Sequence, residues 1–381
     1  MEGASIEIPN QADNKKEAAM ETRVENATMF FDQFMHVEKG EKVLFLSHED
    51  KENTDPELIA ALKESLAKKG IEYTELVANE ETETEEVAKL LSEHKVIWSS
   101  CGWDQTDIDF YQLVDTIEEA GARMEDAAGL TAEALDADGM LSESKEALEE
   151  RLERMHKVLK ESVGFRITTS YGTDLTVGLR PDRDRRWAWA TGEVDEGEWD
   201  NPGAEIFTTP DERKTEGVLV LPVLQDEITR EQGVDEYVRV TFHEGKIVKI
   251  DGGESAEKLR TYLEEMSKEE DDPYSVIQCS ELAFGGSKFA RSKVADPSLS
   301  YEHHGVSVLE AEKRMGTMHV AIGSAQHDAE GASGEVESNV HVDFVLPRNE
   351  LTVKAFYSDD DFRRQENGRK LIDEGRWNLI E

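Results

Sequence analysis

The first part of the chain alternates short apolar runs with segments whose apolar residues recur at helical spacing. The apolar runs predict strands at Val43–Leu46, Ile71–Val77, Val96–Trp98 and Arg123–Met124. The helical spacing predicts helices at Met20–Val37, Asp55–Lys69, Glu85–Leu91 and Asp109–Glu119. Helices between short apolar strands form βαβ units, so we expect a Rossmann-like domain with a parallel sheet. No G-x-G-x-x-G motif follows the first strand, so no dinucleotide site is expected.

The remainder of the chain has a β-rich pattern. A long amphipathic helix, with Leu148, Leu152 and Leu159 on one stripe, leads out of the first domain and ends at Gly164. The strands expected after it are Phe165–Thr169, Leu175–Leu179, Gly217–Leu221, Glu236–Phe242, Lys246–Ile250, His319–Ile322, Val340–Leu346 and Leu351–Phe356, with one helix at Ser255–Met266. A chain of 381 residues exceeds one ordinary core. We therefore expect an α/β protein with a Rossmann-like domain over residues 1–160 and a β-rich α+β domain over residues 161–381.

The composition is strongly acidic, with 85 Asp plus Glu against 43 Lys plus Arg and a formal charge of −42. Spread along the whole chain, such charge is typical of a cytoplasmic protein from a high-salt environment, because molar salt shortens the Debye length to about 3 Å. No basic face can form, so neither nucleic acid nor an anionic membrane is expected as a partner. No spanning apolar run or signal peptide is expected. Cys101 and Cys279 are too few for a disulfide framework or a cysteine zinc site.

Five of the ten histidines lie between residues 303 and 341. Polar neighbours favour ordinary surface positions for His303, His304 and His327. His341 and Asp343, in contrast, alternate with apolar residues, and side chains two apart share one face of a strand. An imidazole and a carboxylate projecting together form half of a ligand set for a divalent metal. A surface strand with alternating polar residues fits the same spacing equally well.

Three other polar residues interrupt apolar runs. His319 lies in a β-like run, where a lone histidine is more commonly a hydrogen-bonded core residue than a ligand. Glu205 is bounded by turn residues, and Glu281 is a single acid in a run that ends in glycine. A buried carboxylate without a partner costs several kcal/mol, so each glutamate requires a cation. A metal would serve, and so would an arginine such as Arg291.

Four blocks resemble the aminopeptidase T and aminopeptidase S type metallopeptidases, in the family order and over roughly residues 165–357. The stretch 201–210 is similar to N-x-P-x-G-E-V-F-T-x-P, although Ala204 separates the glycine from Glu205. The stretch 281–285 resembles a glutamate followed by an apolar, glycine-containing run. The stretches 312–323 and 341–344 resemble E-K-x-x-G-T-x-H-x-A-x-G and H-x-D-F.

This resemblance implies a dimeric enzyme that cleaves peptides with two divalent ions. The implied metal ligands are Glu205, Glu281, His319, His341 and Asp343. Carboxylates with imidazoles suit zinc, cobalt, manganese or iron better than calcium. Two such ions lower the pKa of a bridging water and polarise the scissile carbonyl, while one of them receives the substrate amine. The resemblance makes Glu312 the candidate general base; an exposed glutamate beside Lys313 and Arg314 is the alternative.

Departures from the family pattern leave a rival function open. Gln326 stands where some members carry a tyrosine, and the loop 331–334 lacks paired glycines. A ring-cleaving dioxygenase of the 2,5-dihydroxypyridine 5,6-dioxygenase type resembles this fold and shares H-x-D. It requires one ferrous ion on two histidines and a carboxylate. The position of Glu281 resembles a histidine in those enzymes, so glutamate favours the peptidase. A binding protein without catalysis would show no metal dependence.

Overall fold

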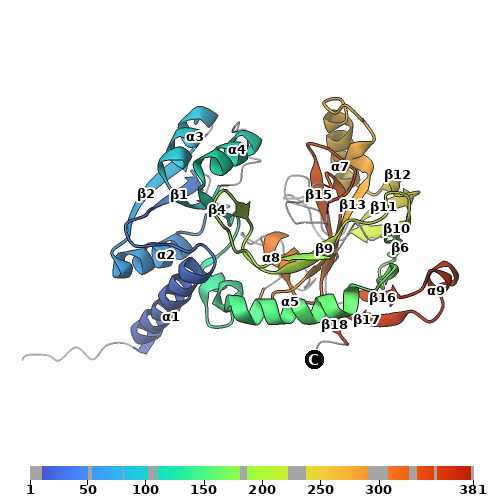
Figure 1. Cartoon of the computed structure of the whole chain (residues 1–381), viewed down its shortest axis with the longest axis horizontal. Helices are drawn as coiled ribbons and strands as arrows, with labels where there is room; N and C mark the ends of the chain where they lie inside the picture. The colour runs from blue at the N-terminus through green and yellow to red at the C-terminus, as the bar shows by residue number, and fades with distance from the viewer. Residues whose placement is uncertain are drawn as a thin grey trace, which may run out of the picture. The chain divides into compact units, whose positions relative to one another are not determined.

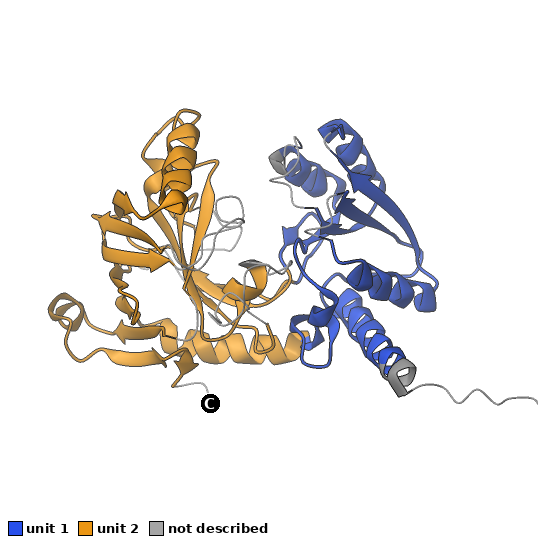
Figure 2. Cartoon of the chain, turned by 180° about the vertical axis from the view of Figure 1, so that it is seen from behind, with its two compact units in different colours: residues 1–144, 193–201 blue, residues 145–192, 202–381 orange. Residues whose placement is uncertain are grey.

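The structure, a computed structural model, describes residues 11–49, 54–79, 81–101, 108, 110–180, 187–221, 237–290, 308–325, 333–346 and 350–378. The chain divides into two compact units (Figure 2). Unit 1 holds residues 1–144 and 193–201, and unit 2 holds residues 145–192 and 202–381. The chain therefore leaves unit 1, returns to it for one short segment and leaves it again. Helix α5 (Lys145–Leu159), which ends at the boundary expected from the sequence, clusters with unit 2.

Unit 1 is built on a parallel five-stranded sheet in the order β2-β1-β3-β4-β8. Its strands are β1 (Lys42–His48), β2 (Glu72–Ala78), β3 (Val96–Ser100), β4 (Arg123–Asp126) and β8 (Trp199–Asp200). Its helices are α1 (Gln11–Gln33), α2 (Pro56–Lys69), α3 (Thr84–Glu93) and α4 (Phe110–Ala120), followed by the short 3-10 turns η2 (Ala132–Leu135) and η3 (Met140–Ser142). Figure 1 shows α3 and α4 on one side of this sheet and α1 and α2 on the other. The predicted Rossmann-like arrangement is confirmed.

Local sequence signals explain where the elements of unit 1 begin and end. Asp55 accepts a hydrogen bond from the backbone N–H of Glu57 at 2.8 Å, and Pro56 occupies the first turn of α2. Gly70 closes the same helix in the left-handed region, at φ +69°. Side chains of α3 and α4 join those of β1, β3 and β4 in one buried cluster. Strand β8 lies outside the predicted elements, because two residues carry no measurable periodicity.

Unit 2 contains two antiparallel sheets. The eight-stranded sheet has the order β12-β11-β10-β6-β5-β16-β17-β18, and the five-stranded sheet has the order β15-β14-β13-β9-β7. The strands of the first are β5 (Gly164–Thr168), β6 (Asp174–Gly178), β10 (Thr215–Leu221), β11 (Val238–His243), β12 (Lys246–Asp251), β16 (Thr352–Phe356), β17 (Arg369–Asp373) and β18 (Arg376–Trp377). Those of the second are β7 (Ala188–Ala190), β9 (Glu205–Thr208), β13 (Cys279–Gly285), β14 (Met318–Gly323) and β15 (His341–Leu346). Its helical segments are α5, α7 (Glu254–Met266), η4 (Ser275–Ile277), α8 (Val308–Lys313) and α9 (Asp359–Arg364).

One face of the five-stranded sheet is a continuous apolar layer. The strand register aligns Leu282 of β13 with Val320 of β14 and Phe344 of β15, and all three are fully buried. Beside this row, the ring of Phe284 lies 5.8 Å from that of Phe165 on β5. This contact joins the two sheets of unit 2 through their apolar faces and leaves the other face of the smaller sheet for polar residues.

Among the residues that the structure describes, no helix combines the length and the hydropathy required to cross a bilayer.

Candidate metal centre

The polar face of the five-stranded sheet carries the site residues predicted from the sequence. In an antiparallel sheet, residues directly opposite one another share a face, and so do residues two apart on one strand. The register places Glu281 of β13 opposite Ala321 of β14, and Ala321 opposite Asp343 of β15. Glu281 and Asp343 therefore flank an alanine, the smallest side chain that still forms a regular strand.

At the neighbouring positions on this face, each polar side chain again lies opposite an alanine or a glycine on an adjacent strand. His319 lies opposite Ala283, and His341 lies opposite Gly323. Glu205 at the start of β9 lies opposite Gly285. The small residues leave the space into which the polar side chains extend. The structure thus brings all five predicted ligands together from four adjacent strands.

The distances within this group are those of a compact polar cluster. The Nε2 atom of His319 lies 3.1 Å from Oε1 of Glu281, 3.5 Å from Oε2 of Glu205 and 3.8 Å from Oδ1 of Asp343. The Nε2 atom of His341 lies 3.4 Å from Oε2 of Glu281 and 3.5 Å from Oδ1 of Asp343. The two oxygens of Glu281 consequently face two different imidazoles. Donor atoms of Glu205, Glu281 and His319 all lie within 4.8 Å of one another.

The cluster is closed on one side and open at His341. The side chain of His319 is 3% exposed, whereas that of His341 is 34% exposed. Nδ1 of His341 lies 3.1 Å from the backbone carbonyl oxygen of Ser324. A proton on Nδ1 would be donated to this carbonyl, which leaves Nε2 as the lone-pair nitrogen facing the carboxylates. The centre is therefore more accessible to solvent at His341 than at His319.

Helix α8 brings two further charged residues to the same face. Its Ala311 packs against Val345 of β15, next to the position of Asp343. Both Glu312 and Lys313 are buried, so the interpretation of Glu312 as an exposed residue is wrong. The Nζ atom of Lys313 lies 2.5 Å from Oε1 of Glu205 and 3.3 Å from Oε1 of Glu312.

Lys313 was not identified as a functional residue from the sequence. Its flexible ammonium group holds the side chains of Glu205 and Glu312 from a single point. The signal that could have identified it is its place in the E-K pair that opens the block 312–323. A lysine in such a block, three residues before Gly316 and four before Thr317, is more typical of a site than of an ordinary surface.

The electrostatic field of the cluster attracts positive charge. Burial by itself lowers the pKa of His319, but Asp343, Glu281 and Glu205 outweigh it and raise this pKa to about 10. The pKa of His341 is raised in the same way, since Asp343 and Glu281 overcome the effect of burial. Burial is also the main reason why the pKa of Glu312 rises to about 7, while Lys313 opposes the rise.

The donor set fits divalent cations. Oxygen and imidazole donors in this proportion are typical of zinc, manganese, cobalt and iron sites, whereas calcium sites use oxygen alone. Oε1 of Glu205 is held by Lys313, but its Oε2 is buried and accepts no hydrogen bond within the described part of the chain. A buried carboxylate oxygen needs a positive charge or a hydrogen-bond donor beside it. A divalent cation between Glu205 and His319 would meet this need.

The end of β13 fixes the elements that carry this centre. The backbone N–H of Ala204 donates to Oγ of Ser287 at 2.8 Å, and the N–H of Ser287 donates to the carbonyl of Lys313 at 2.8 Å. A Cβ atom added at Gly285 would lie 2.2 Å from the carbonyl oxygen of Arg314 and 2.5 Å from that of Glu312. The glycine is thus required for the close approach of the segment that follows α8.

Some residues discussed in the sequence analysis lie outside the described part of the chain. They are Arg291, His303, His304, Gln326, His327 and residues 331–332.

Comparison with known proteins links this chain to two kinds of enzyme. The family described as NicX, 2,5-dihydroxypyridine 5,6-dioxygenase, matches residues 27–354. Aminopeptidase PepS of Streptococcus thermophilus is 26% identical over 215 residues, which are 55% of this chain and 49% of that protein. The match thus spans about half the length of this curated relative.

Two solved structures share the fold over nearly the whole chain. Wild-type AmpT from Thermus thermophilus superposes with a TM-score of 0.63 at 14% identity and covers 94% of this chain and 99% of that one. The 2,5-dihydroxypyridine dioxygenase from Pseudomonas putida KT2440 gives a TM-score of 0.59 at 17% identity, with 93% and 97% covered. The fold class and the resemblance to the aminopeptidase T and S type enzymes are confirmed.

The substitution Ala321→Val tests the space between Glu281 and Asp343. Two added methyl groups would fill the gap between these carboxylates, and such overpacking costs about 1–3 kcal/mol in a packed core. We expect the affinity for Zn²⁺, measured by calorimetry, to fall at least about tenfold while the circular dichroism spectrum is unchanged. Val320→Ile, on the apolar face of the same strand, is the matched control and should keep the wild-type affinity. Equal Zn²⁺ affinity of both variants would show that the cations bind elsewhere.

Gly285→Ala tests the support of Glu312 and Lys313. The new methyl group cannot fit without displacing the backbone after α8, so both the free energy of unfolding and the Zn²⁺ affinity should fall, the former by about 1–3 kcal/mol. Gly70→Ala is the control, because its site has no atom within 4 Å and only the left-handed φ of +69° opposes a side chain. That variant should lose stability alone. A Gly285→Ala protein with undiminished Zn²⁺ affinity would contradict the proposed support.

Proposed function

The chain belongs to the family described as 2,5-dihydroxypyridine 5,6-dioxygenase, whose fold is shared with aminopeptidases, and from this premise we propose that it is a metal-dependent aminopeptidase. Its substrates would be peptides, from which it would release the N-terminal residue. The position of Glu281 carries the proposal. Its two oxygens face different histidines, at 3.1 and 3.4 Å, as expected for a carboxylate between two ions. A single ferrous site needs only two histidines and one carboxylate.

The proposed ligands are Glu205, Glu281, His319, His341 and Asp343. Two divalent ions held by them would supply a water of lowered pKa and polarise the scissile carbonyl. Because the donors are carboxylate oxygens and imidazole nitrogens, the ions would be zinc, cobalt, manganese or iron. Their positive charge would balance the carboxylates that share this buried face of the sheet.

Glu312 would act as the general base. Its buried carboxylate lies on the ligand face, and Lys313 holds one of its oxygens at 3.3 Å. It would accept a proton from the attacking water and donate it to the departing amine. Lys313 would act as a positioning residue, because it fixes Glu205 and Glu312 together. The excess of carboxylates would favour a substrate with a free α-ammonium group, which is the requirement of an exopeptidase.

The alternative is a mononuclear iron dioxygenase that opens the ring of a dihydroxypyridine. Family membership and one solved structure favour it. If this chain were such a dioxygenase, its His319, His341 and one carboxylate would hold the iron. Three further carboxylates, counting that of Glu312, would then remain in the pocket with Lys313 beside Glu205 and Glu312. The donor excess in this pocket is the reason for ranking the peptidase first.

Metal analysis combined with hydrolysis of aminoacyl-anilides at high salt tests the proposed function. We expect the centre in unit 2 to hold about two ions per chain, and chelation should abolish release of the aniline. Glu281→Gln should lower kcat at least about 100-fold and reduce the metal content, because the bridging charge is lost. Glu72→Gln, an exposed strand glutamate in unit 1, is the control and should behave as the wild type. A single iron with oxygen uptake on 2,5-dihydroxypyridine would replace the peptidase by the dioxygenase, and metal-independent hydrolysis would overturn both.

We also propose that the protein is adapted to high salt, on the basis of its net charge of −42. Repulsion among like charges destabilises the compact state, and molar salt screens it by shortening the Debye length from about 10 Å to about 3 Å. The thermal unfolding midpoint should rise by more than about 10 °C between 0.1 M and 2 M KCl. Choline chloride at equal ionic strength should reproduce most of the rise, since screening is not specific to one cation. An unchanged or lower midpoint would contradict salt adaptation.

A further inference from the structure

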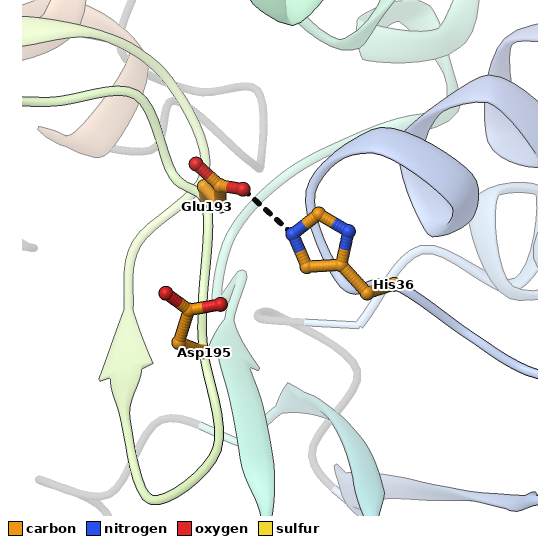
Figure 3. A group of neighbouring side chains, drawn as sticks. All are labelled: His36, Glu193 and Asp195. Carbon is orange, nitrogen blue, oxygen red and sulfur yellow. Dashed lines mark hydrogen bonds and ion pairs between the residues drawn. The ribbon is translucent and has the colours of Figure 1, made fainter.

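Unit 1 contains a second group of metal-binding side chains, made of His36, Glu193 and Asp195 (Figure 3). His36 follows helix α1, whereas the two carboxylates belong to the segment 193–201, on which the chain returns to this unit. One donor atom from each residue lies within 4.8 Å of the others. Nε2 of His36 is 2.6 Å from Oε1 of Glu193, and Figure 3 shows the carboxylate of Asp195 on the same side of the imidazole.

The backbone on both sides of this group is held in place. His36 adopts the left-handed region at φ 49°, and its carbonyl accepts a hydrogen bond from Arg123 at 3.2 Å. Arg123 is itself fixed by Glu41 at 2.6 Å. On the returning segment, the N–H of Val194, between the two carboxylates, donates to the carbonyl of Phe34 at 2.9 Å. The three side chains therefore converge from two anchored segments and not from one flexible loop.

The chemistry of the group matches a divalent transition metal. One imidazole and two carboxylates are donors that zinc, manganese and cobalt share, and their two negative charges balance one divalent ion. Two of the side chains are partly buried, with 36% exposure for His36 and 24% for Glu193, whereas Asp195 is exposed. Within the part of the chain that the structure describes, no lysine or arginine forms an ion pair with Asp195. With metal bonds of about 2.0–2.2 Å, an ion would replace the hydrogen bond between His36 and Glu193, and their atoms, now 2.6 Å apart, would move apart to make room for it.

We propose that His36, Glu193 and Asp195 bind one divalent ion of the zinc type, separate from the centre in unit 2. The ion would join the end of α1 to the returning segment and so hold β8 at the edge of the parallel sheet beside β4. Its role is structural: no substrate is required, and the reaction in unit 2 does not involve it. The inference is independent of the proposed peptidase function.

Zinc binding by the full chain tests the proposal. The probe is Zn²⁺ alone at a fixed free concentration in 1 M KCl, and bound metal is counted per chain by elemental analysis. His36→Asn and Asp195→Asn should each bind one ion fewer than the wild type. Glu196→Gln removes a neighbouring exposed carboxylate outside the group and should bind as the wild type does. The Glu281→Gln variant has a weakened centre in unit 2, so the Zn²⁺ that it still binds should lie in unit 1. The double variant Glu281→Gln/His36→Asn should lose this ion.

Stability provides the second readout. Zn²⁺ should raise the thermal unfolding midpoint of the wild type and of Glu281→Gln, and the rise seen in Glu281→Gln should disappear when His36→Asn or Asp195→Asn is added to it. Two results would overturn the site. If His36→Asn lowers stability but keeps the full number of ions, His36 and Glu193 form an ordinary ion pair. If Glu196→Gln loses as much Zn²⁺ as Asp195→Asn, the binding is unspecific attraction to an acidic surface.

Discussion

Four buried carboxylates, those of Glu205, Glu281 and Asp343 on one sheet face and that of Glu312 on helix α8, set the main constraint on unit 2. A buried charge without a counter-charge costs several kcal/mol, so this face cannot exist without cations. Lys313 supplies one positive charge, and the two histidines accept protons readily for the same reason. Divalent ions would supply the remainder. Binding of metal here would therefore be linked to the integrity of this part of the fold.

The strand geometry allows the polar cluster and the apolar core to be built from the same strands. Along β14, His319 and Ala321 point to the cluster, while Val320 lies in the apolar row with Leu282 and Phe344. The period of two of a β-strand separates these roles without an extra element. A shift of one residue in register would exchange the two faces, so the apolar row fixes the position of every ligand.

The fold was predictable from the sequence wherever periodicity was clear, as for the helices and strands of unit 1 before residue 126. The site was predictable in two steps: spacing indicated only His341 and Asp343, whereas Glu205, Glu281 and His319 depended on the resemblance of ordered blocks. Strand β13 was not predicted, because it is buried on both faces and shows no alternation. The burial of Lys313 was not predictable either, since it depends on how α8 packs on the sheet.

The return of the chain to unit 1 at residues 193–201 has a consequence for how this protein can be dissected. A fragment that stops at residue 144 would lack β8, and the edge of β4 that β8 covers would be exposed. It would also lose Trp199, which packs against the core of that sheet. Unpaired strand edges promote association between chains. The two units are separate in their cores but not in their order along the polypeptide, so isolating the first one requires joining its two pieces with a short linker across the excised stretch.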